Sequence, residues 1–249
     1  MWFGMWFLVG GIGVSVGFHR HFSHRSFSAH PSLRYLMAVA GSMAAQGSPV
    51  YWVALHRMHH TYSDISGDPH SPHAEANGKK DKLSAFIQGH MGWALQHDVP
   101  MPSRYARDLQ ADAVVQRVSK YYALWVLAGL ALPALIAVLW LSKDIGLEAS
   151  AILGLYWGGI LRLALGHHII WSINSVCHLF GSKSHATPDK STNVWWLSLI
   201  SWGESWHNNH HHAPTSARFG VGYRQPDIGW WFISLLCKLR VARVRLISR

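Results

Sequence analysis

Two long apolar segments in the middle of the chain predict a pair of membrane-spanning helices. Residues 121–141 carry no charged side chain, and their length is close to the about 20 residues that a spanning α-helix needs. Residues 149–170 form a second such segment, interrupted by Arg162, after a polar turn at 142–148. A turn this short predicts an antiparallel helix hairpin whose two outer ends lie on the same side of the membrane.

The basic side chains near the hairpin predict its orientation. The turn at 142–148 contains one lysine against one aspartate and one glutamate. Basic residues gather instead beyond the two outer ends: Arg104, Arg107, Arg117 and Lys120 before the hairpin, and Lys183, Lys190 and Arg218 after it. By the positive-inside rule, both outer ends are expected on the cytoplasmic face.

Three other segments are partly apolar. Residues 1–18 are uncharged and lack the basic start of a signal peptide, so they predict a third span that enters the cytoplasm at His19. Residues 31–55 are interrupted by Gly41, Gly47 and Pro49, and we expect a helix on the membrane surface or beneath the site. Residues 227–249 set an apolar run against five basic side chains, which predicts an interfacial amphipathic helix.

The composition agrees with a membrane protein. The chain is 49% hydrophobic and only 14% charged, whereas a soluble domain carries about 25% charged residues. The net charge of +10 would suit nucleic acid or an anionic membrane, and the apolar runs favour the membrane, so no nucleic-acid partner is expected. We predict one all-α integral membrane domain over residues 1–249. The expected spans are about 1–18, 121–141 and 149–170, and the expected cytoplasmic cap is 19–120 and 171–249.

Two cysteines, in no metal-binding spacing, exclude a thiolate zinc site, but the chain has 19 histidines, many of them in three clusters. The clusters contain His19 and His24; His56, His59 and His60; and His207, His210 and His211. In the second and third clusters the i, i+3, i+4 spacing puts three imidazoles on one helix face. The first pair is five residues apart, about 140° on an α-helix, and therefore needs a helix end or a bent turn.

All three clusters lie just outside the predicted spans on one side of the membrane, so they can meet. A single cluster would be a solvated polar loop, but three favour a metal site. The histidines of the three clusters outnumber the four ligands of one zinc ion, so two metal ions fit better. Imidazole is a suitable ligand for iron, zinc or copper. A carboxylate-bridged site needs glutamates from four helices, and the chain has three glutamates in all. The site is therefore expected to be nearly all histidine.

Four segments together resemble a known family. They are HRHFSHRSF, HRMHHTYSD…DPH, WSINSVCHLFG and GESWHNNHHHAPTSAR. In order and spacing they are similar to the membrane fatty acyl desaturases of the stearoyl-CoA or acyl-lipid Δ9 type. The residues within these motifs are closer to those of bacterial members. The likeness runs from about residue 8 to 235. It implies four transmembrane helices in two hairpins under a cytoplasmic helical cap. We expect the first helix and part of the second to be absent here.

The resemblance implies a di-iron centre. Its nine ligands would be His19, His24, His56, His59, His60, His178, His207, His210 and His211. Asn174, one turn before His178, would hold a metal-bound water. His178 enters only through the likeness, because a lone histidine is otherwise read as a core residue. His21 and His212 are left out, as are His167 and His168. Asp64, Asp68 and Glu204 are candidates to orient the imidazoles, since metal-bound histidines need a hydrogen-bond acceptor at the other ring nitrogen.

The implied reaction uses dioxygen and two electrons to place a cis double bond, Δ9 in position, in a saturated acyl chain, with release of two waters. Trp52, Trp93, Trp171 and Trp202 are expected walls of an apolar substrate tunnel. Phe7 and Gly11 are expected at its closed end, and Arg57 at the thioester end. An Arg-Lys pair that animal enzymes carry after the HVGW segment is absent, so acyl-CoA, acyl carrier protein and acyl-lipid substrates stay open.

No electron-carrying domain is visible in the sequence, so a separate donor of the ferredoxin or cytochrome b5 type is expected to dock on the basic cytoplasmic face. Two other functions stay open. One is a membrane hydroxylase of the alkane or carotenoid kind, which shares histidine-rich motifs. The other is a non-catalytic metal-binding membrane protein, which would carry polar ligands inside its spans.

Overall fold

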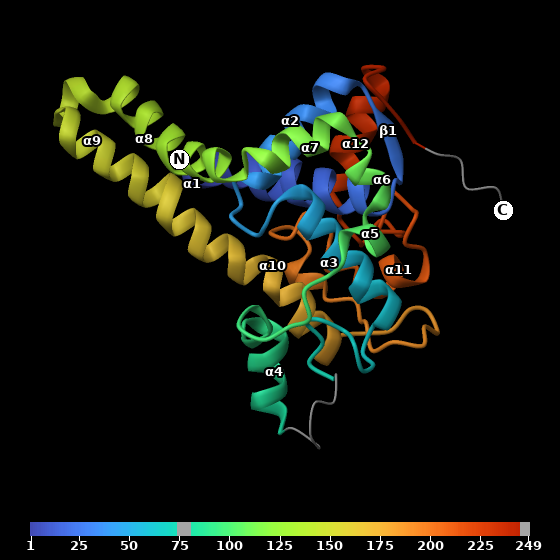
Figure 1. Ribbon diagram of the computed structural model, residues 1–249. Helices are drawn as coiled ribbons and strands as arrows, with labels where there is room; N and C mark the ends of the chain where they lie inside the picture. The colour runs from blue at the N-terminus through green and yellow to red at the C-terminus, as the bar shows by residue number, and fades with distance from the viewer. Residues whose placement is uncertain (74–80, 245–249) are drawn as a thin grey trace.

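The computed structural model describes residues 1–73 and 81–244, and these residues are mostly helical (Figure 1). Two long helical arms project from a body in which the remaining helices pack around the end of the first helix. The elements are α1 (Trp2–Trp6), η1 (Phe7–Ser23), β1 (Phe27–Ala29), α2 (Pro31–Ser42), α3 (Pro49–Tyr62), α4 (Lys82–His90), η2 (Gly92–Ala94), α5 (Pro102–Tyr105), α6 (Arg107–Gln110), α7 (Ala113–Lys120), α8 (Tyr122–Ile145), α9 (Leu147–Gly154), η3 (Leu155–Ile160), α10 (Leu161–Leu179), η4 (Trp195–Leu197), α11 (His207–His212), α12 (Ile228–Lys238) and β2 (Ala242–Val244).

Three helices are long and apolar enough to cross a membrane: Trp2–Ser23, Tyr122–Ile145 and Leu147–Leu179. They correspond to the three predicted spans, and the all-α membrane fold class is confirmed. The third helix runs well past the predicted end at residue 170, because no glycine or proline interrupts residues 167–180. This extension carries the helix beyond its apolar part into the body of the protein.

The hairpin is tighter than its polar turn suggested. Residues 142–145 stay helical, and the reversal rests on Gly146, whose φ of 83° suits glycine. The two arms then pack closely at small residues. A Cβ on Gly154 would lie 2.3 Å from the carbonyl oxygen of Pro133, and one on Gly158 would lie 2.3 Å from the Pro133 ring. Small residues thus permit the close helix approach that is typical of membrane hairpins.

Arg162, the single charge in the predicted span 149–170, is buried and bonded to backbone oxygens. Its guanidinium donates to the carbonyls of Gly158, Met43 and Gly129 at 3.1, 2.9 and 2.9 Å. These bonds tie the hairpin to the end of α2. Arg162 therefore has a structural role, since an intramembrane charge needs such partners.

The first span packs against α2 through glycines. A Cβ on Gly13 would lie 2.3 Å from the backbone nitrogen of Gly41, so only glycine allows this contact. After α2 the chain breaks at residues 43–48, where Ala45 and Gly47 both have positive φ. The predicted helix over 31–55 is thus two helices, and α3 begins at Pro49 with the Ser48 hydroxyl accepting a bond from Tyr51 N–H.

The C-terminal prediction is wrong in its second half. The helix α12 ends at Lys238, Arg240 takes a left-handed φ of 59°, and β2 then pairs antiparallel with β1. The hydrogen bonds of the exposed β1 edge are satisfied in this way. The helix itself packs inward through the fully buried Ile233, and its first turn is capped by Asp227. Residues 245–249 lie outside the described part of the chain.

Candidate metal centre

The first two histidines come from an unusual helix. In η1 the hydrogen bonds run from residue i to i+5, and such π-type stretches are frequent at functional sites. This pattern continues to the helix end, where His24 N–H donates to His19 O at 3.2 Å. Residues five apart therefore lie one turn apart, and the two imidazole rings are 5.0 Å apart. The wider helix, rather than a bent turn alone, brings the HRHFSH pair together.

The second cluster lies on α3 and serves two positions. His56 and His60, four residues apart, face the first pair, with ring centroids of His24 within 4.9 and 4.6 Å. His59 turns to the side, toward His178 and His211 at 5.2 and 5.3 Å. The i, i+3, i+4 spacing thus predicts correctly that the three side chains share one helix face. It does not show that His56 and His60 belong to one group of histidines and His59 to another.

The third cluster lies on the short helix α11, which would be marginal by itself. Its two asparagines hold it in place. Asn208 Oδ1 accepts the backbone N–H groups of Ser184 and His185 at 2.8 Å each, and Asn209 Nδ2 donates to Phe219 O at 2.8 Å. The asparagines of HNNHHH are therefore structural, and His207, His210 and His211 on either side of them belong to the histidine groups.

All nine predicted histidines come together, in two groups. The five-histidine group is His19, His24, His56, His60 and His210. The four-histidine group is His59, His178, His207 and His211. Within each group the nearest ring nitrogens all lie within 4.8 Å of one another, so each group can hold a metal ion.

The distances between the ring nitrogens are those expected for ligands of a shared metal ion. The Nε2 atoms face one another at 2.7 Å for His24 and His56, 3.1 Å for His19 and His210, and 3.0 Å for His178 and His207. Two ligands at right angles on a metal with bonds of about 2.1 Å would be about 3 Å apart. In addition, the buried Nε2 atoms of His59 and His211 have no hydrogen-bond partner. Buried polar atoms of this kind need a partner, and a metal ion supplies one.

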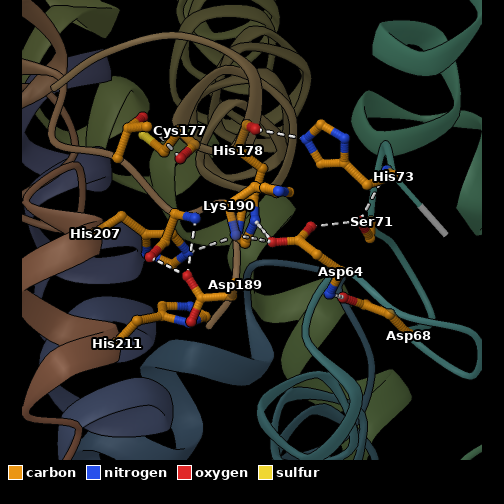
Figure 2. A network of polar contacts seen from close by, with 12 residues as sticks. Asp64, Asp68, Ser71, His73, Cys177, His178, Asp189, Lys190, His207 and His211 are labelled. Atoms are coloured by element: carbon orange, nitrogen blue, oxygen red, sulfur yellow. Dashed lines mark hydrogen bonds and ion pairs between the residues drawn. The ribbon is translucent and has the colours of Figure 1, made fainter. Parts of the chain in front are cut away.

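Carboxylates orient four of the nine rings. The Nδ1–H group of His178 donates to Asp64 at 2.8 Å (Figure 2). That of His59 donates to Asp68 at 2.9 Å. His19 donates to Glu204 in the five-histidine group. The three candidates for this role thus contact ligand-group histidines as expected from the sequence.

The fourth carboxylate, Asp189, was not predicted. It accepts the Nδ1–H group of His211 at 3.0 Å, and Figure 2 shows it beside His207 and His211. No histidine cluster stands near residue 189 in the sequence, and only the packing of the 181–194 loop on α11 brings the pair together. His70, from the DPH segment, was also missed as a site neighbour: its ring lies 4.4 Å from that of His59.

The protonation states of six of the nine histidines suit metal binding, whereas for His59 the contact with Asp68 outweighs burial and raises the pKa. Burial, with repulsion from neighbouring imidazoles, holds the pKa values of His24, His56, His60, His207 and His210 well below the usual value. Burial likewise lowers the pKa of His211 to about 4. Neutral imidazoles are the form that ligates metals. Burial raises the pKa values of Asp64, Asp68 and Asp189, but their histidine partners outweigh it, and the carboxylates stay ionised.

Glu204 belongs to a buried charge network. Arg20, fully buried one residue after His19, donates to Glu204 Oε1 from Nε and Nη2 at 3.1 Å each. It also contacts Asp227 at 2.9 Å and lies over the Phe219 ring. The network fixes the carboxylate that orients His19.

Two adjoining cavities reach the histidine groups. The inner cavity, about 60 Å³, is lined by Trp6, Gly10, Val14, Ser15, His19, Trp52, His56, His59, Ile169, Ile170, Ile173, Asn174, Ser201, Glu204 and His207. The outer cavity, about 230 Å³, is lined by Ala45, Gln46, Gly47, Tyr51, Trp52, Leu55, His56, His70, Trp93, Ala94, His97, His167, Ile170, Trp171 and Asn174. They share Trp52, His56, Ile170 and Asn174, so together they can hold a bent apolar chain beside the histidines.

Most of the predicted substrate residues lie at these cavities. Trp52 lines both, Trp93 and Trp171 line the outer one, and Asn174 borders both beside His207 of the four-histidine group. Phe7, Gly11 and Trp202 do not line either. Phe7 packs on Trp202 with ring centroids 4.8 Å apart, and a Cβ on Gly11 would overlap the same indole.

Trp6 and Gly10 occupy the end of the inner cavity in their place. The expectation for Phe7 and Gly11 counted turns of an α-helix back from His19. Because η1 has i to i+5 hydrogen bonds, it contains more residues per turn than the 3.6 of an α-helix. The face that contains His19 therefore reaches Val14, Gly10 and Trp6 instead.

Arg57 also lies elsewhere than expected. Its guanidinium donates to the carbonyls of Phe22, Ser23 and Tyr105 and to both oxygens of Asp108, at 2.6–3.1 Å. All of its donors are used, and it lines neither cavity. Arg57 fastens α3 to the end of the first span.

The histidines left out of the site lie outside both groups. His21 donates Nδ1–H to Phe27 O at 3.0 Å, and His212 is exposed and stacks on His185. His167 donates to Leu163 O within its own helix, and His168 contacts His90 at 2.9 Å. These contacts agree with the structural roles expected for them.

Comparisons with known proteins point the same way. The model of the family described as "Fatty acid desaturase" matches residues 1–227. The hex-5-enoyl-[acyl-carrier protein] acetylenase of Moorena producens is 40% identical over 95% of this chain and 73% of its own length. The sn-1 stearoyl-lipid 9-desaturase of Anabaena variabilis is 34% identical over 96% and 80%, and Delta-9 acyl-lipid desaturase 1 of Arabidopsis thaliana is 36% identical over 92% and 69%. The chain belongs to the fatty acid desaturase family and is an oxidoreductase of the membrane.

Proposed function

We propose that this protein introduces a cis double bond at the Δ9 position of a saturated, lipid-linked acyl chain, with two irons held by the nine histidines. The observation that supports it most is the sorting of these histidines into a five-membered and a four-membered group, both bordering the inner of the two cavities. When bound there, two irons would supply the activation of dioxygen that removal of hydrogen from an unactivated methylene requires.

The residues of the chain have separate tasks in this proposal. Glu204, Asp64, Asp68 and Asp189 hold four imidazoles in the tautomer that presents Nε2 to the metal. Asn174, whose amide borders both cavities beside the four-histidine group, is placed to hold a water there. This group has one histidine fewer, so it has room for such a ligand.

The cavities position the acyl chain. Trp52 stacks on His56 at 5.2 Å with an interplanar angle of 17°, so a chain that passes this indole passes the five-histidine group as well. Ile170 lies where the two cavities meet, and the chain must bend between them. Fixing one pair of carbons next to the metals in this way contributes both rate and positional selectivity.

A lipid-linked substrate is favoured over acyl-CoA. Several relatives are named as acyl-lipid desaturases, while one is named for an acyl carrier protein substrate and one for an acyl-CoA substrate. Among the described residues, the outer cavity has no lysine or arginine in its lining, and such side chains are what the phosphates of coenzyme A would need.

Electrons come from a separate protein. The histidine groups lie at the end of the spans toward which the basic residues of the chain gather, and by the positive-inside rule this end faces the cytoplasm. A ferredoxin or cytochrome b5 type donor would dock on that face.

The test is expression of the chain in a host whose fatty acids are analysed by mass spectrometry. We expect new cis-Δ9 monoenes, lost in His207→Ala and kept in the matched variant His212→Ala, since His212 is exposed and outside both groups. Hydroxylated acyl chains would support a membrane hydroxylase instead. Bound metal with no change in lipids, in the presence of a working donor, would support a non-catalytic metal-binding protein.

A further inference from the structure

The two histidine groups differ in the number of carboxylates behind them. In the four-histidine group, three of the four rings donate Nδ1–H to an aspartate: His178 to Asp64, His59 to Asp68 and His211 to Asp189, at 2.8, 2.9 and 3.0 Å. In the five-histidine group, the described residues include one such carboxylate, Glu204 on His19. The four-histidine group therefore lies in the more negatively charged surroundings.

The difference in charge persists when Arg20 is counted, because its guanidinium is shared between Glu204 and Asp227 and leaves these three groups with one net negative charge, against three behind the four-histidine group. The buried guanidinium of Arg20 donates to Glu204 twice at 3.1 Å. Apart from their histidines, Asp64, Asp68 and Asp189 have hydroxyl and backbone N–H partners in the described part of the chain. The ammonium group of Lys183 does come near, but it donates to the backbone oxygen of Asp189 at 2.6 Å.

Solvent does not screen these three charges. The side chains of Asp64, Asp68 and Asp189 are 3%, 0% and 7% exposed. A buried charge acts on a nearby cation much more strongly than one in water. A carboxylate behind a ligating imidazole also makes that ring a stronger ligand. Both effects favour a metal ion in the four-histidine group.

The additional imidazole of the five-histidine group acts in the opposite direction, because it adds a ligand there. This ligand is neutral, however, whereas the three buried carboxylates attract the full charge of the ion in the four-histidine group. We infer that the four-histidine position binds a divalent metal more tightly than the five-histidine position and fills first, with Asp64, Asp68 and Asp189 as its positioning residues. This inference rests on the metal centre of the proposed function and adds an order of loading.

Cobalt(II) tests the inference without any catalytic readout. Full-length protein in detergent would be stripped of metal and titrated with Co²⁺ against a chelator of known affinity, with bound metal measured by mass spectrometry. His24→Ala with His60→Ala leaves the four-histidine position, and His178→Ala with His207→Ala leaves the other. We expect the Kd for Co²⁺ at the four-histidine position to be at least about 10-fold lower than at the five-histidine position. This is the size of the change in metal affinity expected from one carboxylate that is hydrogen-bonded to a ligand.

Asp189→Asn then separates the charge from the imidazoles. On the background that keeps the four-histidine position, it is expected to weaken Co²⁺ binding about 10- to 100-fold. On the other background it should leave the Kd unchanged, as should the exposed control Asp98→Asn on both. Asp64→Asn carries the same prediction if Asp189→Asn does not give a folded, monodisperse protein by circular dichroism and gel filtration.

Three outcomes would overturn the inference: equal affinities, tighter binding at the five-histidine position, or an Asp189→Asn variant with unchanged affinity. A protein that binds no Co²⁺ at either position would overturn the proposed function as well. Two positions of equal affinity would overturn only the order of loading, so the two failures are distinguishable.

Discussion

The first and second membrane-crossing helices are both apolar, yet they are used in opposite ways. In the most apolar stretch of Trp2–Ser23, 67% of the residues are buried within the protein, against 17% in Tyr122–Ile145. The first helix packs its glycines on α2 and ends in metal-ligand candidates, whereas the second exposes side chains such as Leu135, Leu139 and Trp140. Lower hydropathy and a high glycine content thus accompany a span that is surrounded by protein rather than by lipid.

The largest effect is expected from filling the contact of the first helix. In Gly13→Val the new Cβ would meet the backbone of Gly41 at 2.3 Å, and backbone cannot move aside as a side chain can. We expect a loss of stability of about 3 kcal/mol or more, at the upper end of overpacking effects. The matched change Leu135→Val in the second helix should shift the melting temperature in detergent little. Similar losses in both variants would contradict the difference between the helices.

A smaller effect is expected for the carboxylate that orients His19. In Glu204→Gln the His19 ring loses its charged acceptor and Arg20 loses a charged partner, so we expect an about 10- to 100-fold drop in desaturation rate. Glu148→Gln, at the exposed turn of the hairpin, is the control and should retain full activity. Product formation per mole of purified protein measures both. A Glu204→Gln variant with unchanged activity would remove Glu204 from the site.

The register of the first helix predicts chain-length selectivity. Trp6→Leu enlarges the closed end of the inner cavity, so longer acyl chains should be accepted, whereas Phe7→Ala should leave the product profile unchanged because Phe7 packs on Trp202. Gas chromatography of products from mixed chain lengths checks this. A shift for Phe7→Ala with none for Trp6→Leu would restore the α-helical register expected from the sequence.

The smallest effect concerns the ion pair of Arg57 with Asp108 at the end of the first helix. Burial raises the pKa of Asp108, but Arg57 and Arg25 outweigh it and lower the pKa to about 2. A lowered folded-state pKa means that the stabilisation is present above about pH 4 and is lost as the pH falls toward 2. The loss should be about 1 kcal/mol, since Asp108 is partly exposed. Asp108→Asn should flatten this part of the stability curve; an unchanged slope would contradict it.

Much of the site could be predicted because its signals are local. The i, i+3, i+4 spacing identifies His56, His59 and His60 as one face from helix geometry alone, and the apolar runs identify three spans from length alone. His178 could be assigned only by family resemblance, since a lone histidine has no spacing. Asp189 could not be assigned at all, because it lies in a loop, 22 residues before its partner His211.

The sequence by itself determined that the chain is a membrane helix protein with a histidine-rich metal centre, because periodicity, apolar length and ligand type are properties of short segments. Only the tertiary structure decided how the nine histidines divide into five and four, that Trp6 and Gly10 rather than Phe7 and Gly11 end the cavity, and that Arg57 is a clamp. Each of these depends on a rotation between elements. The i to i+5 bonding of one helix changes which side chains share a face, and no local pattern in the sequence records it.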